Sequence, residues 1–208
     1  MAVCMEGDNV TDHYYSEKPD VESRRESIAE TVAGVAFRFY VDRGVFSKTG
    51  MDFGTRLLIE SFNPPEAAGA IGDVGCGWGA IGIAVGKKYP ARRIVMTDIN
   101  ERAVELAKLN AQLNGVGNAE VLQTNLLEGV TDSFAAVMTN PPIRAGKKVI
   151  FALYEQAVGS LLPNGEIWVV IQKKQGAPST IKKLEELGLE VSVVNKAKGY
   201  LIISGKKS

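Results

Sequence analysis

The stretch Asp73-Val74-Gly75-Cys76-Gly77-Trp78-Gly79-Ala80 decides the fold of this 208-residue chain. Residues 70–74 are an apolar run typical of a buried strand, and residues 80–88 have the composition of a helix that ends before Pro90. The three glycines let the backbone turn tightly and approach a ligand closely. The stretch therefore predicts a strand, a glycine-rich loop and a helix whose first N–H groups can meet an anion.

The same alternation of strands and helices continues along the chain. Strands are expected at 37–41, 70–74, 93–97, 120–123, 134–139, 166–171, 189–194 and 199–204, and helices at 52–62, 80–88, 100–114, 149–162 and 180–187. Asn100 is expected to cap the third helix, with Leu106 and Leu113 on its apolar face. The pattern predicts an α/β fold, Rossmann-like, with a mostly parallel sheet and helices on both faces. The last two strands are too close for a helical crossover, so they should pair antiparallel.

Length and composition indicate one globular domain, residues 28–208, preceded by a polar and charged N-terminal extension, residues 1–27. No apolar stretch approaches the roughly 18 residues of a membrane span, and the N-terminus lacks a signal-peptide pattern, so a cytoplasmic location is expected. Two isolated cysteines and one histidine argue against disulfides or a metal site. Cys76 has no partner base and is expected to be a small filler.

The net charge of zero hides an asymmetry. Residues 1–143 carry 13 Lys and Arg against 19 Asp and Glu, a net of −6, whereas residues 144–208 carry 11 against 5, a net of +6. Five basic residues follow predicted strands and are candidates for phosphate binding: Arg144, Lys147, Lys148, Lys173 and Lys174. An ordinary solvated face with scattered lysines explains the charge equally well.

The chemistry of the glycine-rich loop favours S-adenosylmethionine as cofactor. Gly75-x-Gly77-x-x-Ala80 also fits a loose dinucleotide fingerprint, but Asp73 would repel a pyrophosphate and attract a sulfonium and an ammonium group. Asp98 ends the next strand, about 25 residues later, near the usual spacing for a ribose-binding carboxylate. Asn125 ends the third strand and either contacts adenine or is an ordinary turn residue.

Asn140-Pro141-Pro142-Ile143 follows the predicted strand 134–139. Each proline fixes its own φ and lacks an N–H, and Pro142 biases Pro141 toward an extended conformation. The Asn140 side-chain oxygen and a nearby backbone carbonyl can then face one spot as acceptors. Such a spot suits an exocyclic NH₂ group, which has two N–H donors.

From about residue 13 onward, the chain resembles the class I S-adenosylmethionine-dependent methyltransferases, and most closely the catalytic domain of small-subunit rRNA guanine-N2 methyltransferases. The stretches that carry the resemblance are 13–16, 44–47, 52–54, 73–79, 98–100, 140–143 and 172–176. The resemblance implies a seven-stranded sheet with one antiparallel strand near the C-terminus. It implies a catalytic motif at Asn140, Pro141, Pro142 and Ile143, with Asn140 and Pro141 holding the amine, and cofactor contacts at Asp73, Gly75, Gly77, Gly79, Asp98, Ile99, Asn125, Asn140 and Phe46.

The chain departs from that family in three places. Many amino-methyltransferases have an aromatic residue at the position of Ile143, so Phe46 is a candidate for stacking on the base instead. Asn125 stands where Asp is common, although an amide oxygen can still accept a hydrogen bond. The family's second, degenerate domain is missing, and a homodimer or the basic C-terminal half could compensate; monomer and homodimer both stay open.

The expected activity is methyl transfer from S-adenosylmethionine to an exocyclic amine, guanine N2 of rRNA. RNA is the expected partner, as rRNA or a ribosomal subunit, and neither a membrane nor a metal is expected. The open alternatives are guanine N7 of rRNA, adenine N6, a protein glutamine, and a non-catalytic RNA-binding module.

Overall fold

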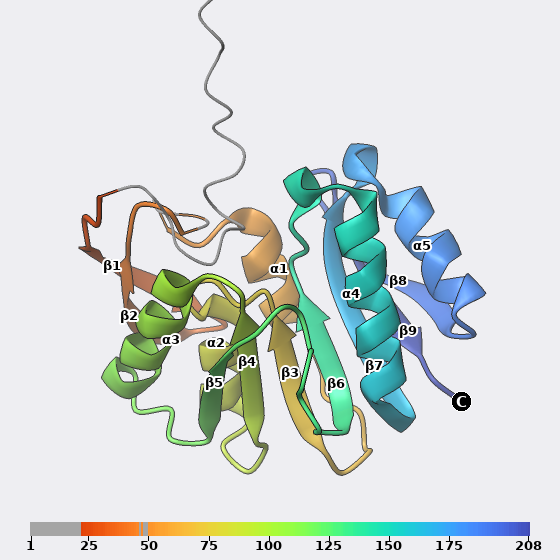
Figure 1. Cartoon of the computed structure of the whole chain (residues 1–208), viewed down its shortest axis with the longest axis horizontal. Helices are drawn as coiled ribbons and strands as arrows, with labels where there is room; N and C mark the ends of the chain where they lie inside the picture. Colours follow the sequence, from red (N-terminus) through yellow and green to blue (C-terminus); the bar gives the residue numbers. More distant parts are fainter. Residues whose placement is uncertain (1–21, 46, 48–49) are drawn as a thin grey trace, which may run out of the picture.

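The computed structural model describes residues 22–45, 47 and 50–208. In these residues the chain forms a two-stranded ribbon and a seven-stranded sheet (Figure 1). The ribbon pairs β1 (Glu26–Val32) antiparallel with β2 (Val35–Val41). The sheet contains β3 (Ala70–Val74), β4 (Ile94–Asp98), β5 (Ala119–Gln123), β6 (Phe134–Thr139), β7 (Leu161–Gln172), β8 (Glu190–Ala197) and β9 (Tyr200–Lys206).

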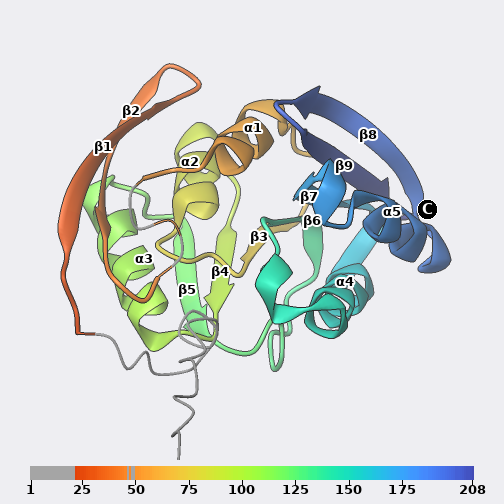
Figure 2. The same ribbon diagram turned by 90° about the horizontal axis from the view of Figure 1, so that it is seen from above.

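Two layers of helices cover the sheet. The helices are α1 (Phe53–Ser61), α2 (Ala80–Lys88), α3 (Glu101–Leu113), α4 (Lys147–Ser160) and α5 (Ala177–Glu186), with short 3-10 turns η1 (Ile143–Ala145) and η2 (Lys173–Gln175). Seen from above, α1, α2 and α3 lie on one side of the sheet, and α4 and α5 lie on the other (Figure 2). No helix among these residues has the length and apolar character that a membrane span requires.

The strand order is β5-β4-β3-β6-β7-β9-β8, and every neighbouring pair is parallel except those that involve β9. The predicted Rossmann-like sheet with one antiparallel strand is confirmed, as is the antiparallel pairing of the last two strands. From β3 the chain proceeds toward β4 and β5 on one side, then returns to β6 and β7 on the other. The reversal lies between β3 and β6, and open α/β sheets bind ligands outside the carboxyl ends of the strands at such a point.

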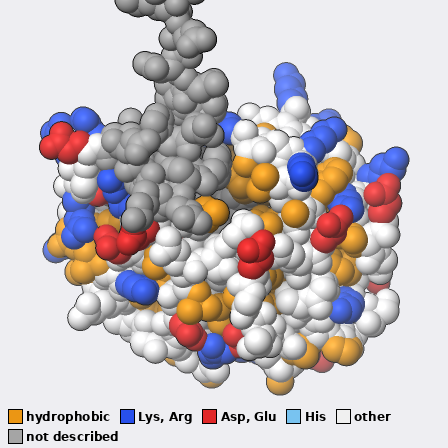
Figure 3. Space-filling model, in the orientation of Figure 1, with side chains coloured by type: hydrophobic (Ala, Val, Ile, Leu, Met, Phe, Trp, Pro, Cys, Tyr) orange, Lys and Arg blue, Asp and Glu red, His pale blue; other side chains and the backbone are white. Residues whose placement is uncertain are grey.

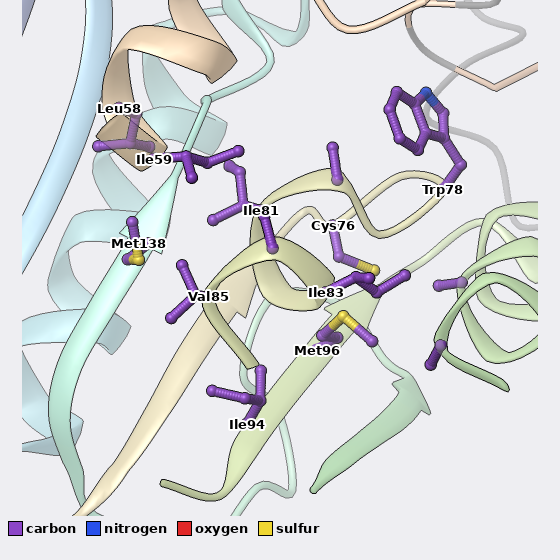
Figure 4. Close-up of a cluster of buried hydrophobic side chains, with 14 of the residues drawn as sticks. Leu58, Ile59, Cys76, Trp78, Ile81, Ile83, Val85, Ile94, Met96 and Met138 are labelled. Carbon is purple, nitrogen blue, oxygen red and sulfur yellow. The ribbon is translucent and has the colours of Figure 1, made fainter. Parts of the chain in front are cut away.

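The central strands are buried along their whole length because helices cover both faces. Leu58, Ile81, Ile83, Met96 and Met138 meet between α1, α2 and the sheet in the core cluster that Figure 4 shows. Burying a side chain of this size contributes about 1.5–3 kcal/mol. The packing is close enough that a Cβ at Gly82 would overlap the side chain of Met96. The helix that follows the glycine-rich loop is therefore held firmly against the sheet.

The ribbon is attached to α3 by two asparagine side chains one helical turn apart. Asn110 accepts from the N–H of Tyr40 (2.7 Å) and donates to the Tyr40 carbonyl (2.9 Å). Asn114 accepts from the N–H of Arg38 (3.1 Å) and donates to the Arg38 carbonyl (2.8 Å). Figure 2 shows the ribbon arching past α3 as a consequence. Asn110 also donates to the Trp78 carbonyl (2.8 Å), which links the ribbon to the glycine-rich loop.

Most predicted elements are found within a few residues of their expected bounds, and three are found as predicted: β3, α2 and β6. Strand β1 was not predicted, and the expected domain boundary after residue 27 falls within it. Leu113 was wrongly placed on the apolar face of α3, because it is 41% exposed. Asn110, at 0% exposed, takes part in the buried face instead.

Candidate functional site

Four predicted site residues stand at the carboxyl ends of neighbouring strands. Asp73 belongs to β3, Asp98 ends β4, Asn125 lies just after β5, and Asn140 directly follows β6. Since β5, β4, β3 and β6 are adjacent in that order, these residues line one edge of the sheet, at the top in Figure 1. The edge includes the point between β3 and β6 at which the strand order reverses.

The glycine-rich loop is held in place by backbone hydrogen bonds. The N–H groups of Gly75 and Cys76 both donate to the Thr97 carbonyl at 2.9 Å, and the N–H of Gly77 donates to Asp98 Oδ2 at 2.8 Å. Gly75 and Gly77 have φ of 74° and 56°, in the region that favours glycine. A Cβ on Gly75 would meet no atom within 4 Å, so the backbone there faces open space.

Asp73 is buried, and only one of its carboxylate oxygens has a partner. Oδ2 accepts from the N–H of Gly82 in the first turn of α2 (2.8 Å), whereas Oδ1 has no hydrogen-bond partner among the described residues. Burial raises the pKa of Asp73 from its ordinary 3.8 to about 7; the Gly82 N–H lowers it in part, and the Asp98 carboxylate raises it further. An unpartnered buried carboxylate oxygen is costly, so it points to a ligand that supplies a donor or a positive charge.

Asp98 is fixed by backbone N–H groups on both oxygens. Oδ2 accepts from Gly77 and Oδ1 accepts from Asn100 (2.9 Å). Burial raises the pKa of Asp98, and the N–H groups of Asn100, Gly77 and Ile99 lower it in part. Asn100 caps α3 as predicted, accepting from the N–H groups of Arg102 and Ala103. The Asp98 side chain is therefore not the cap of α3, and it remains half-buried beside the loop.

The charges and hydrogen-bond acceptors at this edge of the sheet fit S-adenosylmethionine. Two carboxylates stand on adjacent strand ends, and among the described residues neither makes an ion pair with Lys or Arg. A ligand with a sulfonium and an ammonium group would offset this negative charge by Coulombic attraction. Asp73 and Asp98 would hold such a ligand, and the open backbone at Gly75 would let it approach.

The remaining predicted cofactor residues differ in how far the structure describes them. Asn125 is exposed and donates through Nδ2 to Glu128 (2.7 Å), so its Oδ1 is left to accept a hydrogen bond. Ile99 is half-buried and follows Asp98. Gly79 is the N-cap residue just before α2, and a Cβ there would meet Ile83 and Ala107. Phe46, the candidate for stacking, lies outside the described residues.

The Cys76 thiol and the Trp78 ring both belong to the core rather than to an open pocket. Trp78 is 3% exposed and packs on Phe39, with ring centroids 4.7 Å apart. Burial raises the pKa of the Cys76 thiol well above its ordinary value, and the carboxylates of Asp98 and Asp73 add to the effect. The thiol therefore stays protonated at neutral pH and acts as a filler, not a nucleophile.

Asn140 is half-buried, and its amide nitrogen is occupied by α1. Nδ2 donates to Thr55 Oγ1 (2.9 Å) and to Asp52 Oδ2 (3.3 Å). Pro141 is buried, and among the described residues no hydrogen bond is made to its carbonyl. The carbonyl of Pro142 instead accepts from the N–H of Ala145 (2.9 Å) and closes the turn η1. Asn140 Oδ1 and the Pro141 carbonyl are thus left as acceptors.

The sequence did not identify Asp52 and Thr55 as neighbours of Asn140. Asp52 was placed at the start of a helix and in a stretch that carries the family resemblance, but no contact with Asn140 was predicted; it caps the helix by accepting from the N–H groups of Gly54 and Thr55. Its 88-residue separation from Asn140 leaves no local pattern that would reveal the contact. Ile143 is half-buried and packs against the hydrophobic cluster around α4.

The five basic residues predicted to bind RNA all lie exposed at the same edge of the sheet as Asn140: Arg144 in η1, Lys147 and Lys148 in the first turn of α4, and Lys173 and Lys174 in η2. Lys and Arg side chains are visible along the upper right rim in Figure 3. Lys198, which was not predicted, joins this edge in the turn between β8 and β9, with Nζ 4.5 Å from the centre of the Phe53 ring.

No three His, Cys, Asp or Glu side chains in the described part of the chain are placed to hold a metal ion. The polar groups at the strand ends are acceptors and cations suited to organic ligands and phosphates. The arrangement supports binding of a small cationic ligand at Asp73 and Asp98, next to the acceptors of Asn140 and Pro141 that the described residues leave unpaired and to a basic rim formed by the five basic residues and Lys198.

Comparison with known proteins agrees with this description. Residues 36–204 match the family model for the methyltransferase small domain. The Bacillus subtilis protein named uncharacterized protein YbxB is 52% identical over 200 residues, which cover 95% of this chain and 100% of that protein. Ribosomal RNA small subunit methyltransferase C of Pseudoalteromonas atlantica is 34% identical over 158 residues, 74% of this chain but 46% of that protein.

A solved structure has the same fold. It is the T. thermophilus 16S rRNA N2 methyltransferase (RsmC) in complex with AdoMet and guanosine, with a TM-score of 0.78 and 21% identity, covering 91% of this chain and 52% of that chain. This chain thus spans about half the length of the two rRNA methyltransferases. Because the family match covers most of its residues, the chain belongs to the methyltransferase small domain family and is a methyltransferase whose cofactor is S-adenosylmethionine.

Proposed function

We propose that this protein transfers a methyl group from S-adenosylmethionine to an exocyclic amine, the N2 amine of a guanine in rRNA. The observation that carries the proposal is the arrangement of Asn140. Its amide nitrogen is occupied by Thr55 and Asp52, so Oδ1 is left as an acceptor next to the Pro141 carbonyl. Two hydrogen-bond acceptors beside the glycine-rich loop match the two N–H donors of an NH₂ group.

The relatives support the choice of RNA and of guanine. A curated relative that aligns with 74% of this chain is a ribosomal RNA small subunit methyltransferase C. The fold neighbour was solved in complex with AdoMet and guanosine. This chain covers only about half the length of each of these proteins, so the identity of its substrate is a proposal that the experiment below tests.

The residues of the site would act mainly by orientation and electrostatics. When bound, S-adenosylmethionine supplies an electrophilic methyl group. Asn140 Oδ1 and the Pro141 carbonyl each accept one N–H of the target amine, which favours a pyramidal nitrogen with its lone pair directed at that group. Positive charge grows on the nitrogen during transfer, so both hydrogen bonds strengthen most in the transition state.

Proton transfer needs no side-chain base before the methyl group moves. An amide oxygen and a backbone carbonyl do not take up a proton at neutral pH, and the amine becomes acidic only once it carries the methyl group. Its proton then leaves to solvent. Positioning of the two reactants supplies much of the remaining rate enhancement, because effective molarities for well-oriented groups are very large.

The basic rim would hold the RNA backbone. Lys147 and Lys148 occupy the first turn of α4, and Lys173 and Lys174 lie just before α5. A cation near a helix N-terminus is unfavourable with the helix dipole, and neither helix has an acidic residue in its first turn or a side-chain cap. A phosphate at these ends would be stabilised by both the lysines and the helix N–H groups.

The target guanine would have to be unpaired or flipped, because its N2 amine is paired in a duplex. With the basic rim next to Asn140, a single-stranded or looped rRNA segment is the substrate form we propose. Residues 28–208 would form the catalytic domain and residues 1–27 an extension, and either a monomer or a homodimer would bind the RNA.

The test is methyl transfer to rRNA in vitro, followed by digestion and mass spectrometry of the nucleosides. We expect N2-methylguanosine with the wild-type protein. Asn140→Ala should lower turnover by roughly 100-fold or more, since it removes an acceptor used in the transition state, while cofactor affinity changes little. Methyl groups on guanine N7 or adenine N6, on protein glutamine, or on no substrate at all would refute the proposed activity, as would an Asn140→Ala variant with near wild-type turnover.

A further inference from the structure

We propose that Asp52 and Thr55 are positioning residues that set which atom of the Asn140 amide faces the target amine. This inference rests on the proposed function of Asn140 and extends it to two residues at the start of α1. Hydrogen bonds from Asn140 join the end of β6 to the N-terminus of α1, over separations of 85 and 88 residues in the sequence.

The direction of each hydrogen bond in this network is fixed by chemistry. The Asp52 carboxylate can only accept, and its Oδ2 lies 2.5 Å from Thr55 Oγ1. Thr55 has one hydroxyl proton, which it gives to Asp52, so towards Asn140 it can only accept. The group of Asn140 that faces Thr55 and Asp52 must therefore be the NH₂ donor. Asn140 Oδ1 is directed away from α1 and is left for another donor.

The network is anchored well enough to hold that orientation. Thr55 is 5% exposed, and its N–H donates to Asp52 Oδ1 (3.1 Å), as does the N–H of Gly54 (2.9 Å). Asp52 is therefore held by its role as the cap of α1. The nearest arginine in sequence, Arg56, is directed elsewhere, to Glu30 (2.6 Å). Among the described residues Asp52 has no ion-pair partner, so its charge acts on the hydroxyl and the amide.

The charge of Asp52 has a second consequence for Asn140. An amide whose N–H groups donate to a carboxylate and a polarised hydroxyl becomes a better acceptor at its oxygen, because linked hydrogen bonds strengthen one another. Asn140 Oδ1 is the atom that would stabilise positive charge growing on the amine. The network thus both orients the acceptor and strengthens it, which affects turnover more than ground-state binding.

Three substitutions separate this role from a purely structural one. Thr55→Val removes the hydroxyl at constant shape, whereas Thr55→Ser keeps it. Asp52→Asn keeps a residue that caps helices as well as Asp does. In the Asp52→Asn variant, the new side-chain oxygen would cap α1, and the new NH₂ group would face Asn140. Two NH₂ groups cannot pair, so the Asn140 amide would turn its oxygen towards α1. The NH₂ group of Asn140 would then face the substrate.

The expected results differ in size. Thr55→Val should lower kcat by roughly 10- to 100-fold, the scale of a small misplacement of a reacting group. Thr55→Ser should recover most of that loss, and Asp52→Asn should be the most impaired of the three. KM for RNA and the cofactor Kd should each change less than about threefold, because both are dominated by other contacts.

Thr180→Val is the matched control. Thr180 is also a buried threonine whose hydroxyl bonds to a side chain, Tyr154 (3.1 Å), but it lies in α5. The substitution should lower thermal stability about as much as Thr55→Val does without the loss of kcat. Equal kcat losses in the two variants would mean that the effect of Thr55→Val is structural, and would overturn the proposal.

A measurement independent of turnover is the ¹⁵N NMR signal of the Asn140 side-chain NH₂. In the wild-type protein its protons should exchange with water more slowly than those of a solvated amide, and Thr55→Val should abolish this protection. Unprotected NH₂ protons in the wild-type protein, or an active wild type with an equally active Thr55→Val variant, would overturn the positioning role. Wild-type protein that methylates no amine but keeps the protection would refute the proposed function and leave the orientation intact.

Discussion

Replacing Asp73 by asparagine should make the cofactor-free protein more stable and the cofactor less tightly bound. The reason is that Asp73 is buried with one carboxylate oxygen unpartnered among the described residues, and its pKa is about 7 in the folded chain against an ordinary 3.8. Between these two values the folded state holds a proton that the unfolded state has lost. The contribution of Asp73 to the free energy of unfolding is therefore greatest below pH 3.8. It decreases as the pH rises from 3.8 to 7, because the unfolded chain has already lost the proton that the folded chain still holds, and it stays low above pH 7.

The magnitude follows from the size of the pKa difference. Each pKa unit corresponds to about 1.4 kcal/mol, so ionisation of Asp73 lowers the free energy of unfolding by about 4 kcal/mol in total, and by about 3 kcal/mol between pH 5 and pH 8. The asparagine side chain introduced by Asp73→Asn is nearly isosteric with the protonated acid and does not titrate. The stability advantage of this variant should therefore grow by about 3 kcal/mol over the interval, roughly 6–12 °C in Tm at this chain length.

The assay is urea unfolding of both proteins at pH 5, 6, 7 and 8, without cofactor. Thr97→Val is the control, because Thr97 Oγ1 is also buried without a partner among the described residues but does not titrate. That variant should gain about 1 kcal/mol at every pH. A difference between wild type and Asp73→Asn that does not change with pH would refute the reasoning about ionisation.

Cofactor binding should show the opposite effect of the same substitution. A cationic ligand favours ionised Asp73, so wild-type affinity should rise with pH up to about 7, with proton release on binding, and level off above it. Asp73→Asn should bind more weakly and without this pH dependence. Calorimetry in buffers of different ionisation enthalpy measures the released proton; its absence in the wild-type protein would contradict the role of the carboxylate.

Three further predictions concern packing, the cofactor and the RNA. Gly82→Ala should destabilise the fold by about 1–3 kcal/mol in thermal unfolding, because its Cβ would overlap a core side chain, whereas Gly117→Ala, with no atom within 4 Å, should be tolerated; equal stability of the two would contradict the packing. Asp98→Ala should weaken cofactor binding by about tenfold or more in calorimetry, and unchanged affinity would remove the ribose assignment. Lys147→Ala combined with Lys148→Ala should lower the salt dependence of RNA binding by about 1 to 1.5 in log–log slope, with kcat unchanged, and an unaltered slope would show that these lysines contact no phosphate.

The parts of the fold that could be predicted best from the sequence are those specified by local rules. The alternation of apolar runs and helical segments indicated the class of fold, and Asn100 was identified as a cap because capping depends only on neighbouring residues. Helix α4 begins at Lys147, two residues before its predicted start. The start was misplaced because Gly146 precedes the helix, so no polar capping residue marks its first turn in the sequence. Strand β7 begins at Leu161, whereas its predicted start was residue 166. The first part of the strand was missed because it includes Pro163 and lacks the apolar pattern of a strand.

The parts that sequence reasoning missed depend on long-range contacts. Strand β1 is mostly polar at its exposed positions and is specified by pairing with β2, which in turn is held by side chains of α3. At the site, the strand ends were predictable because parallel strands bring their carboxyl ends together. The orientation of Asn140 was not, because it depends on Asp52 and Thr55 through hydrogen bonds that only the folded chain forms.

Asn110 and Asn114 give helix α3 a role that a third strand would have in this ribbon, because their side chains form hydrogen bonds with the backbone of β2. A lone hairpin is marginally stable in water, and an open strand edge invites association with other chains. Here two amide side chains satisfy the backbone groups of Arg38 and Tyr40, so that edge is closed without a further strand. Since Asn110 also donates to the Trp78 carbonyl, a substitution that loosens the ribbon should also disturb the glycine-rich loop, where we propose that the cofactor binds, although the substituted residue would not contact the cofactor itself.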